Sequence, residues 1–236
     1  MRTSRFKFQM ATGLRKTKYI IEKHSEQVID LVAKHLLPTY MKRLGITREN
    51  QKRKLTDVEA ILDPSHLRKN IFEGASYVAL DESDKLVACS LNYFTSREEW
   101  LKYFVGPNKA IAQNTNYGEN IRKYCQQQYE LYYDVIDLTY DKYNLQTILY
   151  LEDGVTLPEY RGLRIAQWLQ KTVIRDFGEQ YGILGEGMVP LYRIDAGKVN
   201  PAFDAWRKNG FITVKKIVTH DKVMVPVWFR PPQPNH

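Results

Sequence analysis

Residues 158–170 read PEYRGLRIAQWLQ, and the prediction of the fold starts from this stretch. From Ile165 onward the apolar residues have the spacing of one face of an amphipathic helix: Ile165, Trp168, Leu169, Val173 and Phe177. Just upstream, residues 145–157 (LQTILYLEDGVTL) are rich in β-branched and apolar side chains, which predicts a strand. The pattern is therefore a strand, a tight basic turn and a helix.

The turn has the chemistry of an anion site. A helix N-terminus presents unpaired N–H groups and the positive end of the helix dipole, and both favour phosphate. Gly162 would let the backbone approach an anion closely, and Arg161 and Arg164 add positive charge. The alternative is an ordinary connection whose arginines are merely solvated.

Two general phosphate motifs are absent from this turn. The Walker pattern needs a glycine-rich run that ends in Gly-Lys-Ser/Thr, and the turn has neither the run nor the lysine. The dinucleotide-binding fingerprint needs three glycines, and the turn has only Gly162. A bound ligand would therefore be a pyrophosphate-bearing cofactor of another kind.

The composition is that of an ordinary globular protein with a basic excess. The 236 residues are enough for one well-cored domain, and 43% are apolar and 26% charged. The net charge of +8 suits an anionic ligand. The basic residues are spread along the chain without a nucleic-acid-binding motif, and no apolar run could span a bilayer. We therefore expect neither nucleic acid nor a membrane as partner.

Metal-binding residues are sparse. Cys89 and Cys125 are the only cysteines, so neither a disulfide framework nor a cysteine-rich metal site is predicted. None of the five histidines forms a His-x-x-x-His or His-Glu-x-x-His pair, so we expect no catalytic metal.

The N-terminal segment is basic, because the first acidic residue is Glu22. We expect residues 1–17 to be a disordered arm or a plain first segment. A transit peptide is the alternative, but the segment lacks a clear amphipathic period. No secretory signal is visible, so we predict a cytoplasmic protein, monomeric or dimeric, with a single domain over residues 18–232.

The rest of the pattern predicts one sheet with helices packed on it. A first strand is expected over residues 18–23, and residues 76–94 have the pattern of a hairpin around the turn DESDK. Helical segments are expected over residues 26–37, 55–74 (in two pieces), 97–144 and 200–211, and strands over 183–189, 212–220 and 222–229. The fold class is therefore α/β or α+β, with a mixed twisted central sheet flanked by helices.

This order of elements, with its basic turn, resembles the GNAT superfamily of acyl-CoA-dependent N-acetyltransferases. The signature of that family, Arg/Gln-x-x-Gly-x-Gly/Ala, matches residues 161–166, although Arg164 replaces the signature glycine. The preceding residues 158–160 (PEY) are typical of the family. The resemblance implies acetyl-CoA as cosubstrate, bound by this turn: Arg161, Gly162, Leu163, Arg164, Ile165 and Ala166.

A second match lies at residues 200–211, where the family has an asparagine, then a tyrosine, then Gly-Phe. Asn200 and the final Gly-Phe are present, and the resemblance implies that Asn200 belongs to the cofactor site. Trp206 stands in the tyrosine position, and an indole N–H can donate a hydrogen bond but cannot shuttle a proton. Tyr192 is the remaining candidate for a general acid.

Within the superfamily the chain resembles the insect-type arylalkylamine N-acetyltransferases. The supporting stretches are residues 133–144 (YDVIDLTYDKYN), 160–166 (YRGLRIA) and 227–234 (VWFRPPQP). In those enzymes the proposed catalytic glutamate lies in the loop after the first helix. Residues 36–44 (LLPTYMKRL) offer no carboxylate there, so that residue cannot be carried over.

The implied reaction is direct attack of an amine on a thioester in a ternary complex, and the developing oxyanion needs fixed N–H donors. In the resembled fold these donors come from the splayed central strand, here around Val155, Thr156 and Leu157. Asp153-Gly154 alone is a strong hairpin signal, but a turn there would leave a three-residue stub. We expect instead a β-bulge at Gly154 that frees those amides.

A base is also required, because an ammonium group with a pKa of about 10 must lose a proton before it attacks. The candidates are Glu152 and Asp153 on the central strand and Glu186 on the next strand. A carboxylate within an apolar strand is costly unless it is used or paired, which favours Glu186. The alternative is that Glu186 lies at a strand end and is solvated.

Aromatic residues crowd residues 97–144, which wall the acceptor pocket in the resembled fold. Their rings would suit an aromatic amine, and the alternative is that most of them pack helices onto the sheet. Acidic residues alternate with the tyrosines, so a polyamine or a protein lysine is the second acceptor class. We predict an N-acetyltransferase for a small, aromatic primary amine, and the rival is a CoA-binding protein without turnover.

Overall fold

The computed structural model describes residues 15–17, 27–28, 30–32, 34–35, 75–187, 189–190, 206–218 and 223–233. Its strands are β1 (Arg15–Thr17), β2 (Tyr77–Leu80), β3 (Leu86–Ser96), β4 (Thr147–Thr156), β5 (Gly182–Glu186), β6 (Val189–Pro190), β7 (Ile212–Val218) and β8 (Val223–Arg230). Its helices are α5 (Arg97–Trp100), α6 (Gly106–Gln113), α7 (Glu119–Val135) and α8 (Ile165–Phe177). Shorter helical segments are the π-helical η1 (Leu101–Val105) and η2 (Ile136–Asp141) and the 3₁₀ turn η3 (Pro158–Tyr160).

The strands form one mixed sheet in the order β1-β2-β3-β4-β5-β8-β6, and β7 pairs with β8. Strands β4 and β5 are parallel, and the other neighbours are antiparallel. β5 and β6 pair with successive parts of β8, since Ile183–Glu186 face Val227–Arg230 whereas Val189 faces Met224. The predicted fold class, a mixed central sheet with flanking helices, is confirmed.

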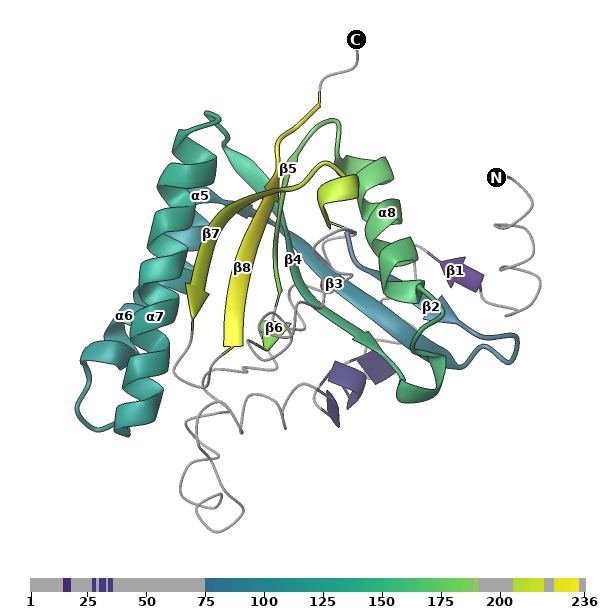
Figure 1. Ribbon diagram of the computed structural model, residues 1–236, viewed down its shortest axis with the longest axis horizontal. Coiled ribbons are helices and arrows are strands. Elements are labelled where there is room, and N and C mark those ends of the chain that lie inside the picture. The colour runs from purple at the N-terminus through teal and green to yellow at the C-terminus, as the bar shows by residue number, and fades with distance from the viewer. Residues whose placement is uncertain are drawn as a thin grey trace.

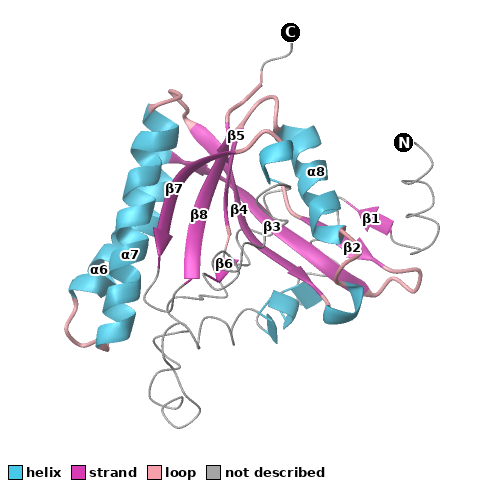
Figure 2. Cartoon of the chain, in the orientation of Figure 1, coloured by secondary structure: helices cyan, strands magenta, loops and turns pink. Residues whose placement is uncertain are grey.

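Helices cover both faces of the sheet (Figures 1 and 2). Helices α5, α6 and α7 lie on one side of it and α8 lies on the other. Because side chains alternate along a strand, β4 contributes to the hydrophobic packing on both faces of the sheet. Ile148 and Tyr150 pack with Leu131 of α7, and Leu149 packs with Leu169 of α8.

Helix α8 begins at Ile165, where the spacing of apolar residues predicts it. Its buried face includes Leu169 and Val173. At its other end the Gly178 carbonyl oxygen accepts a hydrogen bond of 2.6 Å from Nη1 of the buried Arg230. A cation therefore lies at the negative end of the helix dipole, where it stabilises the helix.

The predicted helical character of residues 97–144 is confirmed, and its aromatic residues contribute heavily to the core. Trp100 is fully buried, its ring stacks on Phe104 with centroids 4.4 Å apart, and its Nε1–H donates to the Tyr132 carbonyl oxygen at 2.8 Å. Tyr140 is buried as well. Trp100, Phe104 and Tyr140 therefore pack the helices onto the sheet, which is the alternative stated above for the aromatic residues of this region.

The sheet begins earlier than the predicted domain boundary at residue 18. Arg15–Thr17 pair with Val78–Leu80, so this part of the basic segment forms a strand. The expected strand over 18–23 and the helical pieces over 55–74 lie outside the described residues. The described residues between 27 and 35 are helical, and they include buried Val28.

The hairpin predicted over residues 76–94 is confirmed as β2 and β3, and the predicted final strands are confirmed as β7 and β8. The pair Asp153-Gly154 lies inside β4 and makes no turn. None of the described helices is long and apolar enough to cross a membrane.

Candidate active site

The two central strands run together and then part. Ile148–Leu151 of β4 pair with Gly182–Gly185 of β5. Beyond these pairs β4 continues along β3 to Thr156, whereas Glu186 of β5 pairs with Val227 of β8. In Figure 1, β3 and β4 accordingly slant away from β8. The edge of β4 over residues 152–156 is therefore outside the β4–β5 ladder.

A β-bulge lies at this divergence. Asn92 of β3 faces Leu151 and Leu91 faces Asp153, so Glu152 is the additional residue on β4. A bulge was expected at Gly154, but Gly154 pairs normally with Ser90. The bulge is thus two residues earlier than predicted, and it places Glu152 where the strands part.

The register of β4 decides which of its amides face the parted edge. The Leu157 N–H donates to the Val87 carbonyl oxygen of β3 at 2.9 Å. Hydrogen bonding alternates along an antiparallel pair, so the Val155 N–H also faces β3, whereas Gly154 and Thr156 face away from it. Consistent with this, the Thr156 carbonyl oxygen accepts from Arg161 Nε at 3.3 Å. Of the N–H groups predicted as donors, those of Val155 and Leu157 face β3, and only that of Thr156 faces the parted edge. The Gly154 N–H faces the same edge.

The basic turn before α8 spans residues 157–164 and is called the cradle below. Gly162 has φ of 83° and Arg164 has φ of 59°, so both adopt the left-handed conformation. A Cβ built on Gly162 would meet no described atom within 4 Å. Among the described residues no side chain caps α8, so its first N–H groups are available to a ligand. Arg161 and Arg164 are both exposed.

Arg164 has a left-handed conformation, which glycine adopts without strain, and glycine stands at this position in the signature of the resembled family. A residue with a Cβ is strained in this region by about 1–2 kcal/mol, and glycine is not. We predict that Arg164→Gly raises the free energy of unfolding by about 0.5–1 kcal/mol. Urea denaturation measures this change, with Arg164→Ala as the matched control that removes the charge and keeps the strain. Equal stability of the two variants would contradict the prediction.

Glu186 lies at the end of β5 on the same side of the sheet as the aromatic core. It is half-buried, and its Oε1 accepts a hydrogen bond of 3.0 Å from the Tyr150 hydroxyl. Burial raises the pKa of Tyr150 well above its ordinary value, and the negative charge of Glu186 adds to the effect. Tyr150 therefore stays neutral and acts as a fixed donor to the carboxylate. Glu186, the carboxylate favoured as the base, is thus hydrogen-bonded to Tyr150, which the sequence did not indicate.

Glu152 belongs to the same neighbourhood. It is half-buried at the bulge, and its charge also raises the pKa of Tyr150, though less than burial and Glu186 do. Two candidate bases are thus close to one buried tyrosine. The side chain of Asp153 lies outside the described set. Among the described residues no group of three or more His, Cys, Asp and Glu side chains is placed to hold a metal ion.

Trp206 packs on the α8 side of the parted strands. Its ring stacks on Trp228, with centroids 4.6 Å apart, and meets Phe211 edge-on at 4.5 Å. A Cβ on Gly185 would come within 2.3 Å of the Trp206 ring, so the tryptophan fills the space that this glycine leaves. Tyr192 and Asn200, the other candidates from this part of the sequence, lie outside the described residues.

Known structures share this architecture. No protein-family profile and no curated protein sequence matches the chain. A crystal structure of an agmatine N-acetyltransferase matches 92% of this chain and 98% of its own, with 14% identity and a TM-score of 0.62. The polyamine N-acetyltransferase of Drosophila melanogaster matches 92% and 98%, with 13% identity and a TM-score of 0.61. Arylalkylamine N-acetyltransferase 2 of Aedes aegypti matches 93% and 99%, with 13% identity and a TM-score of 0.63.

These likenesses extend over nearly the whole of both chains, while the identities are low enough that they bear on the fold alone. The TM-scores of 0.61 to 0.63 show that the overall arrangement of helices and strands is shared. The resemblance to the GNAT acetyltransferases is therefore confirmed at the level of the fold, which this chain shares with them.

Proposed function

We propose that the protein is an acyltransferase that moves the acetyl group of acetyl-CoA to a small primary amine. The observation that carries the proposal is the basic turn, where Gly162, Arg161 and the N-terminus of α8 converge beside the parted edge of β4. An open approach to the Gly162 backbone and an uncapped helix end suit a diphosphate. The shared fold makes CoA the diphosphate to test first.

In the proposed reaction, different residues of this chain bind the donor, stabilise the oxyanion and take up the proton. When bound, acetyl-CoA supplies the thioester carbonyl that an amine attacks directly in the ternary complex. Arg161 and Arg164 hold the diphosphate by charge-assisted hydrogen bonds. The N–H groups of Gly154 and Thr156, which face away from β3, would donate hydrogen bonds to the carbonyl oxygen as negative charge develops on it. Glu186, held by Tyr150, would take one proton from the ammonium group through a direct or water-mediated hydrogen bond. After the amine attacks, the C–S bond would break and CoA would leave as the thiol, with the second proton lost by the amine nitrogen.

Two acceptor classes remain, and different observations favour them. An aromatic amine was expected from the rings of residues 97–144, but Trp100, Phe104 and Tyr140 are buried core residues. The two carboxylates near Tyr150, Glu152 and Glu186, would instead suit an amine with a second positive charge. A comparison of kcat/KM for tyramine or serotonin with that for spermidine decides between them.

CoA binding is the direct test of the donor site. Calorimetry on the full chain is expected to show CoA binding, and Arg161→Ala is expected to weaken it by about 10-fold to 100-fold, because one charge-assisted contact is lost. Lys171→Ala is the matched control, because it removes a positive charge from the exposed face of α8 beyond the turn. No binding by the intact protein would end the proposal.

The rival, a CoA-binding protein without turnover, is separated by a transfer assay with a panel of amines. CoA binding with neither transfer nor thioester hydrolysis would favour it. Nucleic acid as ligand is a further alternative that the net charge of +8 raises. A filter-binding series across ionic strength would reveal it as an affinity that falls steeply with salt.

A further inference from the structure

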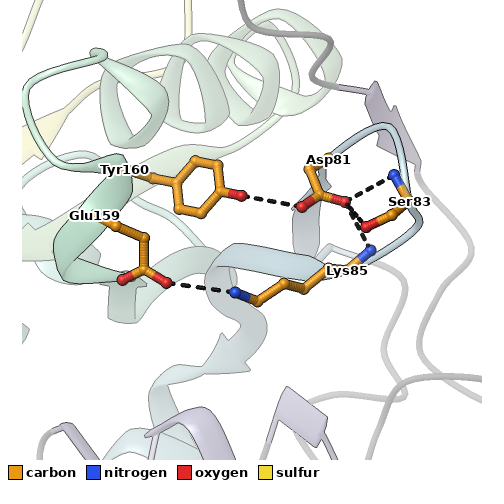
Figure 3. Close-up of polar contacts among 5 residues, drawn as sticks. All are labelled: Asp81, Ser83, Lys85, Glu159 and Tyr160. Atoms are coloured by element: carbon orange, nitrogen blue, oxygen red, sulfur yellow. Dashed lines mark hydrogen bonds and ion pairs between the residues drawn. The ribbon is translucent and has the colours of Figure 1, made fainter.

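The turn between β2 and β3 is built around one carboxylate. Asp81 Oδ1 accepts hydrogen bonds from the Ser83 N–H at 2.9 Å, the Ser83 hydroxyl at 2.7 Å and the Lys85 N–H at 3.0 Å. The backbone closes the same turn, since the Asp81 N–H donates to the Lys85 carbonyl oxygen at 3.0 Å. Figure 3 shows the bonds from the Ser83 N–H, the Ser83 hydroxyl and the Lys85 N–H converging on Oδ1 of Asp81. The orientation of Asp81 is therefore fixed by its own hairpin.

The other carboxylate oxygen points out of the hairpin toward the basic turn. Asp81 Oδ2 accepts a hydrogen bond of 2.9 Å from the hydroxyl of Tyr160, a residue 79 positions away (Figure 3). Lys85 Nζ lies 3.4 Å from a Glu159 carboxylate oxygen and 5.9 Å from the centre of the Tyr160 ring. Glu159 and Tyr160 directly precede Arg161 and Gly162, so the hairpin holds the strand side of the cradle.

The cradle is also attached at a second point. Leu157, at its start, donates its N–H to Val87 of β3, and the Tyr160 N–H donates to the Leu157 carbonyl oxygen at 3.0 Å. The Tyr160 ring packs against the core under α8. Main-chain bonds therefore fix where the cradle leaves the sheet, and the Tyr160 hydroxyl joins the same side of the cradle to the β2–β3 hairpin.

The Asp81 carboxyl is ionised at neutral pH, because its hydrogen bonds lower its pKa. The Ser83 hydroxyl contributes most to lowering the pKa of Asp81 to about 2, and Tyr160 lowers it further. Because this pKa lies below the ordinary value of 3.8, the contribution of the carboxylate is complete above that value and is lost only as the pH falls through about 2. The exposed Lys85–Glu159 pair, by contrast, is screened by solvent and contributes little.

We propose that Asp81 and Tyr160 are positioning residues for the donor, through which the β2–β3 hairpin pre-orients Arg161 and the Gly162 backbone toward the CoA diphosphate. The inference rests on the proposed function. A group that is already oriented loses less freedom when its ligand binds, so a rigid cradle binds more tightly than a loose one with the same charges.

Tyr160→Phe tests this, with two donors that differ in the diphosphate. The variant removes one hydroxyl and keeps the ring in the core. With acetyl-CoA, kcat/KM is expected to fall by about 5-fold to 10-fold, through KM, on the scale of one charge-assisted bond at a partly exposed site. With S-acetylpantetheine, which lacks the diphosphate and the nucleotide, it is expected to stay unchanged. Glu82→Gln, which removes an exposed negative charge from the same turn, is the matched control.

A second variant tests the partnership. If Asp81 acts through Tyr160, then Asp81→Asn combined with Tyr160→Phe loses no more activity with acetyl-CoA than the larger single loss. Equal losses on both donors, or additive losses in the double variant, would show a merely structural role and overturn the inference. Wild-type protein that uses neither donor and binds no CoA would overturn the proposed function and the inference together.

Discussion

Glu186→Gln is expected to lower kcat/KM for transfer from acetyl-CoA to an amine by a factor of about 10²–10⁴, the range of a lost general base. Glutamine keeps the size of the side chain and can still accept a hydrogen bond from Tyr150. It cannot take a proton from the ammonium group of the acceptor. The loss should therefore appear in kcat, while the affinity for CoA, set by the turn before α8, stays as it is.

The pH dependence of the variant distinguishes a base from a structural role. An amine with a pKa of about 10 deprotonates itself as the pH approaches that value. The activity of Glu186→Gln is therefore expected to recover toward that of the wild type between pH 7 and about 10. A structural defect would lower the rate by the same factor throughout.

Glu152→Gln is the matched comparison, because Glu152 lies at the bulge and its negative charge also raises the pKa of Tyr150. We expect a smaller loss from it, since the hydrogen bond from Tyr150 goes to Glu186. A larger loss in Glu152→Gln than in Glu186→Gln would reverse the assignment of the base.

Features set by local sequence were predictable, and the basic turn is the clearest case. The start of α8 at Ile165 follows from the 3.6-residue period, and the hairpin of β2 and β3 follows from two strand patterns around DESDK. Positive φ at Gly162 also agrees with the residue type. In each case the residues that decide the structure are close together in the sequence.

Features set by strand register were not predictable. The bulge lies at Glu152 and not at Gly154, because its position depends on how β4 aligns with Leu91 and Asn92 of β3. That same register turns the Leu157 N–H toward β3 and away from the site. A slip of one residue reverses which groups face which edge, and no local pattern in β4 records it.

Long-range side-chain pairs were missed for a related reason. Tyr150 and Glu186 are 36 positions apart, and Asp81 and Tyr160 are 79 apart. Each pair joins residues that only the sheet brings together. Tyr150 precedes Glu152 by two residues, but the bulge at Glu152 interrupts the alternation of side chains, and no spacing within β4 predicts the pairing of Tyr150 with Glu186.

Trp100→Ala is expected to lower the free energy of unfolding by about 3–5 kcal/mol, the range for truncating a fully buried aromatic residue. Trp100 stacks on Phe104, and its ring meets those of Tyr132 and Tyr150 edge-on at 5.4 and 5.1 Å. Truncation leaves a cavity among these rings and removes the hydrogen bond from Trp100 Nε1 to the Tyr132 carbonyl oxygen. Because domains are stable by only about 5–15 kcal/mol, the urea midpoint should fall steeply.

The same variant tests what the aromatic residues of 97–144 are for. Tyr133, which is 50% exposed on α7, is the matched control, and Tyr133→Ala should cost less than about 0.5 kcal/mol. Trp100 supports Tyr150, which in turn holds Glu186, so folded Trp100→Ala should lose kcat with aromatic and aliphatic amines alike. Unchanged stability with a raised KM for aromatic amines alone would contradict this, since it would place the Trp100 ring in the acceptor site rather than behind the base.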